Sequence, residues 1–204
     1  MEKPDQEAVP SRQFDISKID FDLLSREFAH TRRKNLLLRD LDELVNQQLA
    51  KMLFANPQRI DYYDRYQEII DAYNAEQNRA TIEKTFMDLM ELASSLDTEQ
   101  QRYVREGFSS DEELSVYDLL FSENLTKQEI ETIKKVSVDL LTKIKQQIAK
   151  LDHWTDKQET KAIVDNLIRN TLWQELPNSY DVSDIQTYQK KIYEYVYMRY
   201  PEVA

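Results

Sequence analysis

The chain has 204 residues, a single glycine, five prolines and no cysteine, and it carries a net charge of -11. This composition excludes a disulfide framework and a thiolate metal site, and the excess of acid opposes binding of the whole chain to nucleic acid or anionic membranes. So little glycine leaves few tight turns, and we expect an all-α multi-helix bundle of eight to nine helices with no sheet. No apolar run reaches the roughly 18 residues of a membrane span, so a soluble cytoplasmic protein without a membrane partner is expected.

The chain is expected to divide into a tether and one helical domain. Residues 1–18 are polar, contain two of the prolines and lack helical periodicity, which is typical of a linker. Residues 19–204 form the predicted domain, with sub-halves 19–107 and 108–204 that meet at the only glycine, Gly107.

Four amphipathic helices are predicted in the first sub-half, the first of them starting at Asp20. Asn56-Pro57 ends the second, because a residue before proline is pushed out of helical geometry. Asp61 is expected to cap the third. The apolar stripes of the four helices are Phe21, Leu24 and Phe28; Leu41, Leu44, Val45, Leu49, Met52 and Leu53; Tyr62, Tyr66, Ile69, Ile70 and Tyr73; and Ile82, Phe86, Leu89, Met90 and Ala93.

The hinge between the two sub-halves is built from local signals. Asp97 is expected to cap a fifth helix that ends at Gly107, since glycine enters a left-handed turn without steric cost. Ser109-x-x-Glu112 then has the pattern of a capping box, in which the hydroxyl and the carboxylate bond reciprocally to backbone amides. The sequence therefore predicts that a sixth helix begins at Ser109.

The last three helices each follow a Ser/Thr-x-x-Glu/Gln capping pattern. The seventh helix has the longest apolar stripe of the chain, from Ile130 to Leu151, and is the predicted spine of the second sub-half. The three patterns are Thr126-x-x-Glu129, Thr155-x-x-Gln158 and Ser183-x-x-Gln186.

The tyrosines near the C-terminus give the clearest sign of a partner surface. Tyr193, Tyr195 and Tyr197 alternate as in a strand, but the capping pattern and helical spacing upstream favour a helix. On a helix they cannot all face one core, so at least one points outward. Tyrosine is enriched at interfaces, so we predict a partner-binding surface that includes Tyr193, Tyr197, Tyr200 and Trp154. The alternative is partly exposed packing against a neighbouring helix.

Both tryptophans also have a structural interpretation. Trp154 precedes the eighth helix, where its indole is expected to pack at the helix entrance rather than bind a nucleic-acid base. Trp173 follows Leu172 and is predicted to lie in the core.

One segment departs from the acidic character of the chain. Between Lys127 and Lys161 there are eight lysines and six acidic residues, so this segment is +2 and the rest is -13. A DNA-contacting face is one interpretation, and a solvated helix face of mixed charge is the other. The candidate DNA contacts are Lys134, Lys135, Lys143, Lys145, Arg32 and Arg33.

No catalytic, cofactor-binding or metal-binding residue is predicted. One glycine cannot supply a phosphate-binding loop or a nucleophile elbow, and His30 and His153 lack ligand partners at helical spacing. Asp156, Glu159 and Lys161 are the residue types of a metal-dependent nuclease. On the predicted helix, however, positions i and i+2 diverge by about 200°, so a nuclease site is not expected there.

Several segments, taken in order, resemble the C-terminal helical region of the restriction (R) subunit of type I restriction-modification enzymes. The resemblance runs from about Ile19 to Tyr200 and depends on the order and spacing of all the segments. They are Arg59-Ile60-Asp61-Tyr62-Tyr63-Asp64-Arg65-Tyr66 through Asn74, Arg105-Glu106-Gly107-Phe108-Ser109, Tyr117-Asp118-Leu119-Leu120, Leu140-Leu141, Leu151-Asp152-His153-Trp154 and Glu175-Leu176-Pro177.

The resemblance implies a part in a larger machine. The R subunit of that family has an N-terminal endonuclease domain, two helicase-like motor domains that hydrolyse ATP with Mg²⁺ to translocate duplex DNA, and this helical region. It implies that the chain is a non-catalytic module without a cofactor of its own, which docks the motor onto the methyltransferase (modification) core. The expected partners are the modification subunit and the remaining R-subunit domains, to which residues 1–18 would lead. The rival hypotheses are a DNA-contacting module and a self-standing enzyme.

Overall fold

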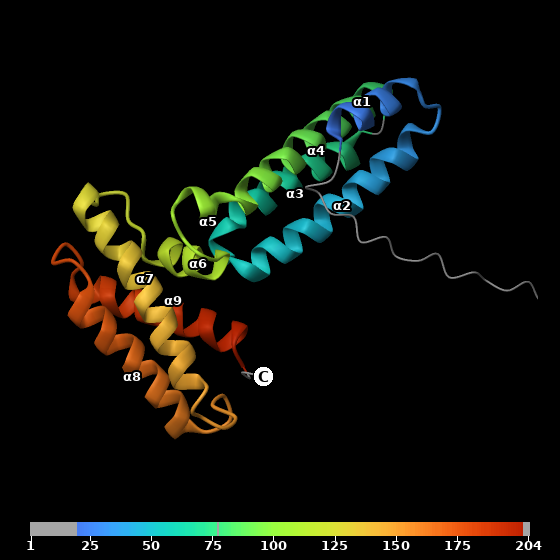
Figure 1. The fold of residues 1–204 in the computed structure, drawn as a ribbon. Helices are drawn as coiled ribbons and strands as arrows, with labels where there is room; N and C mark the ends of the chain where they lie inside the picture. Colours follow the sequence, from blue (N-terminus) through green and yellow to red (C-terminus); the bar gives the residue numbers. More distant parts are fainter. Residues whose placement is uncertain (1–19, 77, 202–204) are drawn as a thin grey trace, which may run out of the picture. The chain divides into compact units, whose positions relative to one another are not determined.

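The computed structural model of the protein describes residues 20–76 and 78–201, so the predicted tether at residues 1–18 lies outside the described part. Within these ranges the secondary structure consists of nine α-helices and one 3₁₀ helix, without a strand, which confirms the all-α prediction (Figure 1). The elements are α1 (Phe21–His30), α2 (Lys34–Ala55), η2 (Pro57–Arg59), α3 (Ile60–Ala75), α4 (Arg79–Gln100), α5 (Arg102–Arg105), α6 (Asp111–Leu120), α7 (Lys127–Ile148), α8 (Gln158–Glu175) and α9 (Val182–Arg199). No helix among the described residues is long and apolar enough to cross a membrane.

The chain divides into two compact units. Unit 1 comprises residues 1–50 and 62–99, and unit 2 comprises residues 51–61 and 100–204. The division near the middle of the chain therefore falls at residue 100, whereas the sequence predicts the boundary between the sub-halves at Gly107. It also assigns a short internal segment, which includes η2, to unit 2.

Unit 1 is built from amphipathic helices that bury narrow stripes. The helix predicted to start at Asp20 is α1, and Asp20 is its N-cap, since its side chain accepts a hydrogen bond from the Leu23 amide at 2.9 Å. Phe28 of α1 stacks on Phe86 of α4 with ring centroids 3.6 Å apart. The buried apolar residues of the unit are Phe28, Leu38, Leu41, Val45, Leu49, Tyr66, Ile69, Phe86, Leu89, Leu92, Ala93 and Leu96, which include members of all four predicted stripes.

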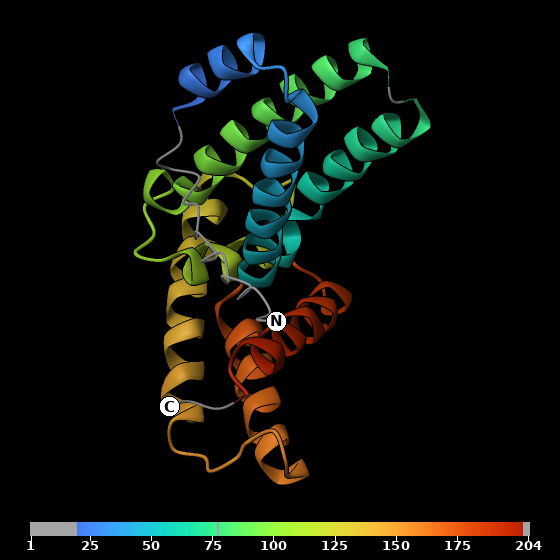
Figure 2. The ribbon, with the colours of Figure 1, turned by 90° about the vertical axis from the view of Figure 1, so that its right-hand side faces the viewer.

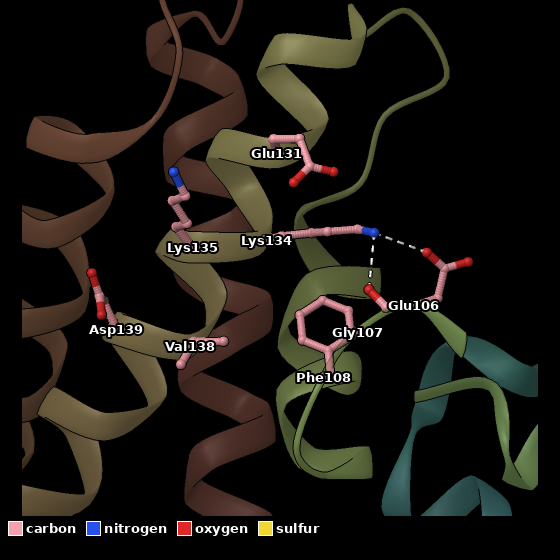
Figure 3. Close-up of a pocket in the computed structure, with 8 residues that line it drawn as sticks. All are labelled: Glu106, Gly107, Phe108, Glu131, Lys134, Lys135, Val138 and Asp139. Carbon is pink, nitrogen blue, oxygen red and sulfur yellow. Dashed lines mark hydrogen bonds and ion pairs between the residues drawn. The ribbon is translucent and has the colours of Figure 1, made fainter. Parts of the chain in front are cut away.

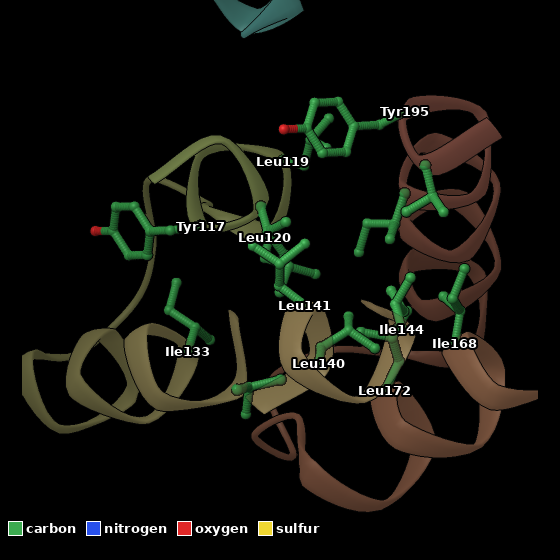
Figure 4. Packing of buried hydrophobic residues seen from close by; sticks show 14 of the residues in the cluster. Tyr117, Leu119, Leu120, Ile133, Leu140, Leu141, Ile144, Ile168, Leu172 and Tyr195 are labelled. Atoms are coloured by element: carbon green, nitrogen blue, oxygen red, sulfur yellow. The ribbon is translucent and has the colours of Figure 1, made fainter. Parts of the chain in front are cut away.

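Unit 2 has one continuous core around α7. Helix α8 packs against both α7 and α9, and α6 also packs against α7 and α9 (Figure 2). The predicted spine is confirmed, because α7 buries residues from Ile133 to its last residue, Ile148, and Figure 4 shows several of them in the core. The buried apolar side chains of α7 are Ile133, Val136, Leu140, Leu141, Ile144 and Ile148.

The hinge glycine adopts the predicted conformation, but the helix after it begins one residue later than expected. Gly107 has φ +84°, in the left-handed region. Ser110, not Ser109, is the N-cap of α6, and its hydroxyl accepts a hydrogen bond from the Glu113 amide at 3.3 Å. The Ser109 amide instead donates to the Glu113 carboxylate at 2.8 Å. The residue between the glycine and the serines, Phe108, is buried in the core, which sets this register.

Of the N-caps predicted for the last three helices, only that of α7 is confirmed. Thr126 and Glu129 form a complete capping box. Helix α8 begins after Lys157 rather than Thr155, because residues 153–156 form a turn in which the Asp156 amide donates to the His153 carbonyl at 3.0 Å.

Helix α9 uses a different capping box from the predicted one. Asp181 accepts from the Asp184 amide at 2.8 Å, and Asp184 accepts from the Asp181 amide at 3.0 Å, whereas Ser183 lies within the helix. Two aspartates can make the same reciprocal pair of bonds as the Ser-x-x-Gln pattern, and their negative charge favours the helix N-terminus.

Two caps predicted in the first sub-half are also wrong. Asp61 lies within α3. The 3₁₀ helix η2 directly precedes α3, and Asn56 is the N-cap of η2. Asp97 lies within α4, which continues to Gln100. In both places helix formation extends past an aspartate that looks like a cap in the sequence. The end of α2 at Ala55, before Asn56-Pro57, is confirmed.

Candidate protein-interaction site

The C-terminal helix α9 of unit 2 exposes part of its aromatic sequence. Tyr195 is buried against the core, as are Ile192 and Val196. Tyr197 is 39% exposed and the adjacent Met198 is 65% exposed. The prediction of a helix with at least one outward tyrosine is therefore confirmed.

The buried side chain of Trp154 packs against Tyr193 and Tyr197 of α9. It is 1% exposed, and its indole Nε1 donates a hydrogen bond to the Tyr200 carbonyl at 2.6 Å. Its ring meets those of Tyr193 and Tyr197 edge-on, with centroids 6.2 and 5.7 Å apart. The prediction that Trp154 packs at the helix entrance is confirmed. Its candidacy as a partner-binding residue is corrected, because a buried indole cannot touch a partner.

Tyr200, a further predicted contact, faces inward. It is half-buried and its hydroxyl is inaccessible to solvent. The Lys145 ammonium lies 5.2 Å from its ring centroid. Burial, followed by the charges of Tyr195 and Glu112, raises the pKa of the Tyr200 hydroxyl far above its ordinary value. Its position suits it to hold the end of α9 rather than to meet a partner.

A groove of about 620 Å³ runs beside the exposed face of α9. Its walls come from η2, α6, α8 and α9, all within unit 2. Leu119 of α6 and Tyr195 of α9, which Figure 4 shows near each other, contribute buried parts of the lining. The aromatic and apolar residues along this groove, which we call the α9 groove, are Pro57, Leu119, Tyr193, Tyr195, Tyr197 and Met198.

Two lysines border the α9 groove. Lys161 of α8 has its ammonium 5.7 Å from the centroid of Tyr197, and Lys191 of α9 has its ammonium 5.7 Å from the centroid of Tyr188. Neither lysine forms an ion pair with a carboxylate of the described residues. Glu194, also on the lining, lies 3.9 Å from Lys190. The groove thus combines an apolar floor with cations that rest on tyrosine rings.

The lysines predicted to contact DNA are mostly paired with carboxylates. Lys143 bonds to Glu175 at 2.5 Å, and Lys145 bonds to Glu112. Burial acts to raise the pKa of Glu112, but the hydrogen bonds from Lys145 and Tyr200 and the charges of Lys145 and Arg199 together outweigh it, so the pKa is lowered. Both lysines therefore have carboxylate partners within unit 2.

Lys134 and Lys135 line a second pocket, of about 580 Å³, beside Gly107. Lys134 donates to the Glu106 carbonyl at 3.0 Å and pairs with the Glu106 carboxylate at 3.1 Å, whereas Lys135 points to another side of α7 (Figure 3). The lining also holds Glu131 and Asp139. Three acids against two lysines make this pocket a poor match for a polyanion.

The six candidate DNA contacts do not form one basic face. Lys134 and Lys143 are nine residues apart on α7, which places them about 180° apart around the helix. Arg32 and Arg33 are exposed between α1 and α2, and they belong to unit 1. The lysines belong to unit 2.

The comparison with known families identifies the family of this chain. Residues 7–200 match the model of the family described as Type I restriction enzyme HindI endonuclease subunit-like, C-terminal. The chain belongs to this family. A search of curated proteins and a search of solved structures found no match.

Membership of this restriction-subunit family confirms the resemblance seen in the sequence. The name of the family places the chain in the C-terminal part of an endonuclease subunit. Glu159 and Lys161, the nuclease-like pair, lie on α8 as predicted, so helical geometry separates their side chains.

Sequence reasoning missed two features of this family member. Trp173, predicted to be core, is 59% exposed, because α8 buries Leu172 and the next residue lies 100° further around the helix. Met198 and Lys191 line the α9 groove. A signal for the groove was present, because Lys191, Glu194 and Met198 share one stripe at i, i+3 and i+7.

Proposed function

We propose that this chain docks the endonuclease subunit of a type I restriction enzyme onto the methyltransferase (modification) core. The observation that carries the proposal is the exposed aromatic and apolar surface of α9 in a chain of this family. Tyr197 and Met198 stand beside an apolar groove, the kind of surface in which protein interfaces place their anchors.

The packing of Tyr193 and Tyr197 on buried residues favours a role for this surface in binding a partner. Tyr193 and Tyr197 rest on the edge of the buried Trp154, and the Trp154 indole is itself held by a hydrogen bond to the Tyr200 carbonyl. Aromatic side chains held in place lose little conformational entropy when they bind. Such a surface suits a lasting contact between subunits.

In this proposal the chain is the non-catalytic part of its subunit. Nuclease and ATPase chemistry, with ATP and Mg²⁺, belongs to the other domains of the parent, which are its covalent partners, and the assembly works in the cytoplasm. DNA contact by Lys134, Lys135, Lys143 and Lys145 is the rival function. It has less support, because three of these lysines are already paired with carboxylates.

The test is a binding measurement between this chain and the purified methyltransferase core. Size-exclusion chromatography followed by calorimetric titration should give a complex of defined stoichiometry, with or without duplex DNA. Two results would contradict the proposal. The first is a parent enzyme that assembles equally well without residues 20–201. The second is a chain that binds duplex DNA with strong salt dependence and ignores the core.

A further inference from the structure

We infer that the α9 groove binds an acidic amphipathic segment of the partner, with an apolar anchor over Tyr197 and Met198 and carboxylates paired to Lys161 and Lys191. The inference rests on the proposed function, in that the segment belongs to the methyltransferase core. It adds the chemistry of the recognised segment and the residues that recognise it.

The apolar half of this recognition comes from the floor and rim of the groove. Leu119 and Tyr195 are buried beneath it, at 5% and 4% exposure, so the floor belongs to the core of unit 2. Met198 on the rim is 65% exposed. A flexible thioether beside a rigid tyrosine suits an aliphatic or aromatic anchor. The volume of about 620 Å³ falls within the range of ordinary binding pockets.

The charged half comes from two lysines on the groove, Lys161 and Lys191, that are not paired with a carboxylate of the described residues. Lys134, Lys143 and Lys145 each have a carboxylate within ion-pair distance. In the described part of the chain, Lys161 and Lys191 have tyrosine rings beneath them and no carboxylate within that distance. Their charge is therefore available to a ligand. A carboxylate that approaches while the groove excludes water would gain a charge-assisted hydrogen bond.

A protein segment fits the groove better than a nucleic acid does. The floor is aliphatic and aromatic, and Glu194 on the lining would repel a phosphate. The chain as a whole also has a charge of -11, which works against a polyanion of high charge density. A peptide that alternates an apolar anchor with one or two carboxylates satisfies the floor and both lysines without meeting that repulsion.

The test uses the full chain and the methyltransferase core, with two variants and one matched control. Lys161→Glu with Lys191→Glu should weaken binding at least tenfold and reduce its dependence on salt. Tyr197→Ala with Met198→Ala should weaken it to a similar degree without changing the salt dependence. Lys150→Glu, at an exposed lysine just after α7 and outside the groove, should bind as the unchanged chain does. Circular dichroism melts check that all variants are folded.

The outcomes separate the two proposals. If the unchanged chain binds the core and both groove variants bind equally well, the groove inference is wrong and the docking function stands. If the unchanged chain fails to bind the core, both are wrong. A third arm measures binding of the chain to duplex DNA alone. If the unchanged chain binds DNA and the variant with both lysines changed to glutamate does not, the groove binds nucleic acid and the inference is overturned.

Discussion

Unit 1 and unit 2 are both helical, but they are held together by different interactions. Among the described residues, unit 1 has 15 acidic and 8 basic residues, whereas unit 2 has 18 and 16. In unit 1 several ion pairs are exposed, such as Arg79–Glu83 and Lys84–Asp88 within one turn of α4. In unit 2, ion pairs join elements that are distant in sequence.

The polar contacts of unit 2 explain this difference. Arg59 of η2 is 3% exposed and bonds Asp111 of α6 through both guanidinium nitrogens, at 3.0 and 2.6 Å. Asn56 bonds Asp118 at 2.6 Å, and Arg102 bonds the same carboxylate. Burial raises the pKa of Asp118, and Arg102 opposes that rise. These bonds fix how η2, α5 and α6 meet. In unit 1 the apolar stripes and the aromatic stack are joined by pairs with more exposed partners, Lys34–Glu83 and Arg65–Glu91. The α9 groove, the candidate interaction site, lies in unit 2.

The largest expected effect removes the aromatic stack of unit 1. Phe86→Ala should lower the free energy of unfolding of unit 1 by about 3 to 5 kcal/mol, because the ring is fully buried against Phe28. Native-state hydrogen exchange should show the loss of protection in α2 and α4, with α7 and α8 less affected. Leu140→Ala in the core of unit 2 is the matched control and should give the reverse pattern. Equal loss in both units from either change would contradict the division.

The next effect tests the buried ion pair of unit 2. Asp111→Asn keeps the side-chain size but removes the carboxylate charge that the buried Arg59 guanidinium bonds through two nitrogens, which should cost about 3 kcal/mol. Urea unfolding followed by circular dichroism measures it. The comparison is Lys84→Gln in the exposed pair of α4, for which we expect less than about 0.5 kcal/mol. Similar losses of unfolding free energy for the two changes would show that the buried pair of unit 2 stabilises the fold no more than the exposed pair of unit 1.

A smaller effect is expected at the hinge glycine. Gly107→Ala should cost about 1 kcal/mol, because a side chain at φ +84° is strained. No neighbouring atom lies within 4 Å of the added Cβ, so collision contributes nothing. Gly107→Asn should recover part of the loss, since asparagine tolerates the left-handed region. Thermal melts compare the three proteins, and an alanine variant as stable as the unchanged chain would rule out the strain.

The smallest effect concerns pH. Burial acts to raise the pKa of Glu112, but the hydrogen bonds and charges of Lys145, Tyr200 and Arg199 together lower it in the folded state. A lowered folded pKa adds stability above the unfolded value of about 4.5, and that stability is lost as the pH falls through the folded value. Glu112→Gln should therefore reduce the loss of unit 2 stability on acidification. In unit 1, the hydrogen bond from Lys34 lowers the pKa of Glu83, but this exposed group should lose its contribution in high salt. Acid titrations of unfolding at two salt concentrations distinguish them.

Much of the local architecture was predictable because it depends on short-range chemistry. Composition and periodicity predict an all-α chain, the spine of α7, the cap at Thr126 and the left-handed Gly107, and all of these are confirmed. The choice between adjacent N-cap residues was harder to predict. Ser109 and Ser110 are equally suitable N-caps by local sequence, and the burial of Phe108 decides between them.

The candidate site was predictable only in part. An alternating run of tyrosines on a helix was enough to predict that at least one of them faces outward, and Tyr197 does. The burial of Trp154, the exposure of Trp173 and the pairing of Lys145 depend on which helices become neighbours. The α9 groove joins η2, α6, α8 and α9, which are separated by many residues in sequence. Helix formation is local, so the sequence alone could predict it, whereas burial and charge pairing are long-range and only the tertiary structure decided them.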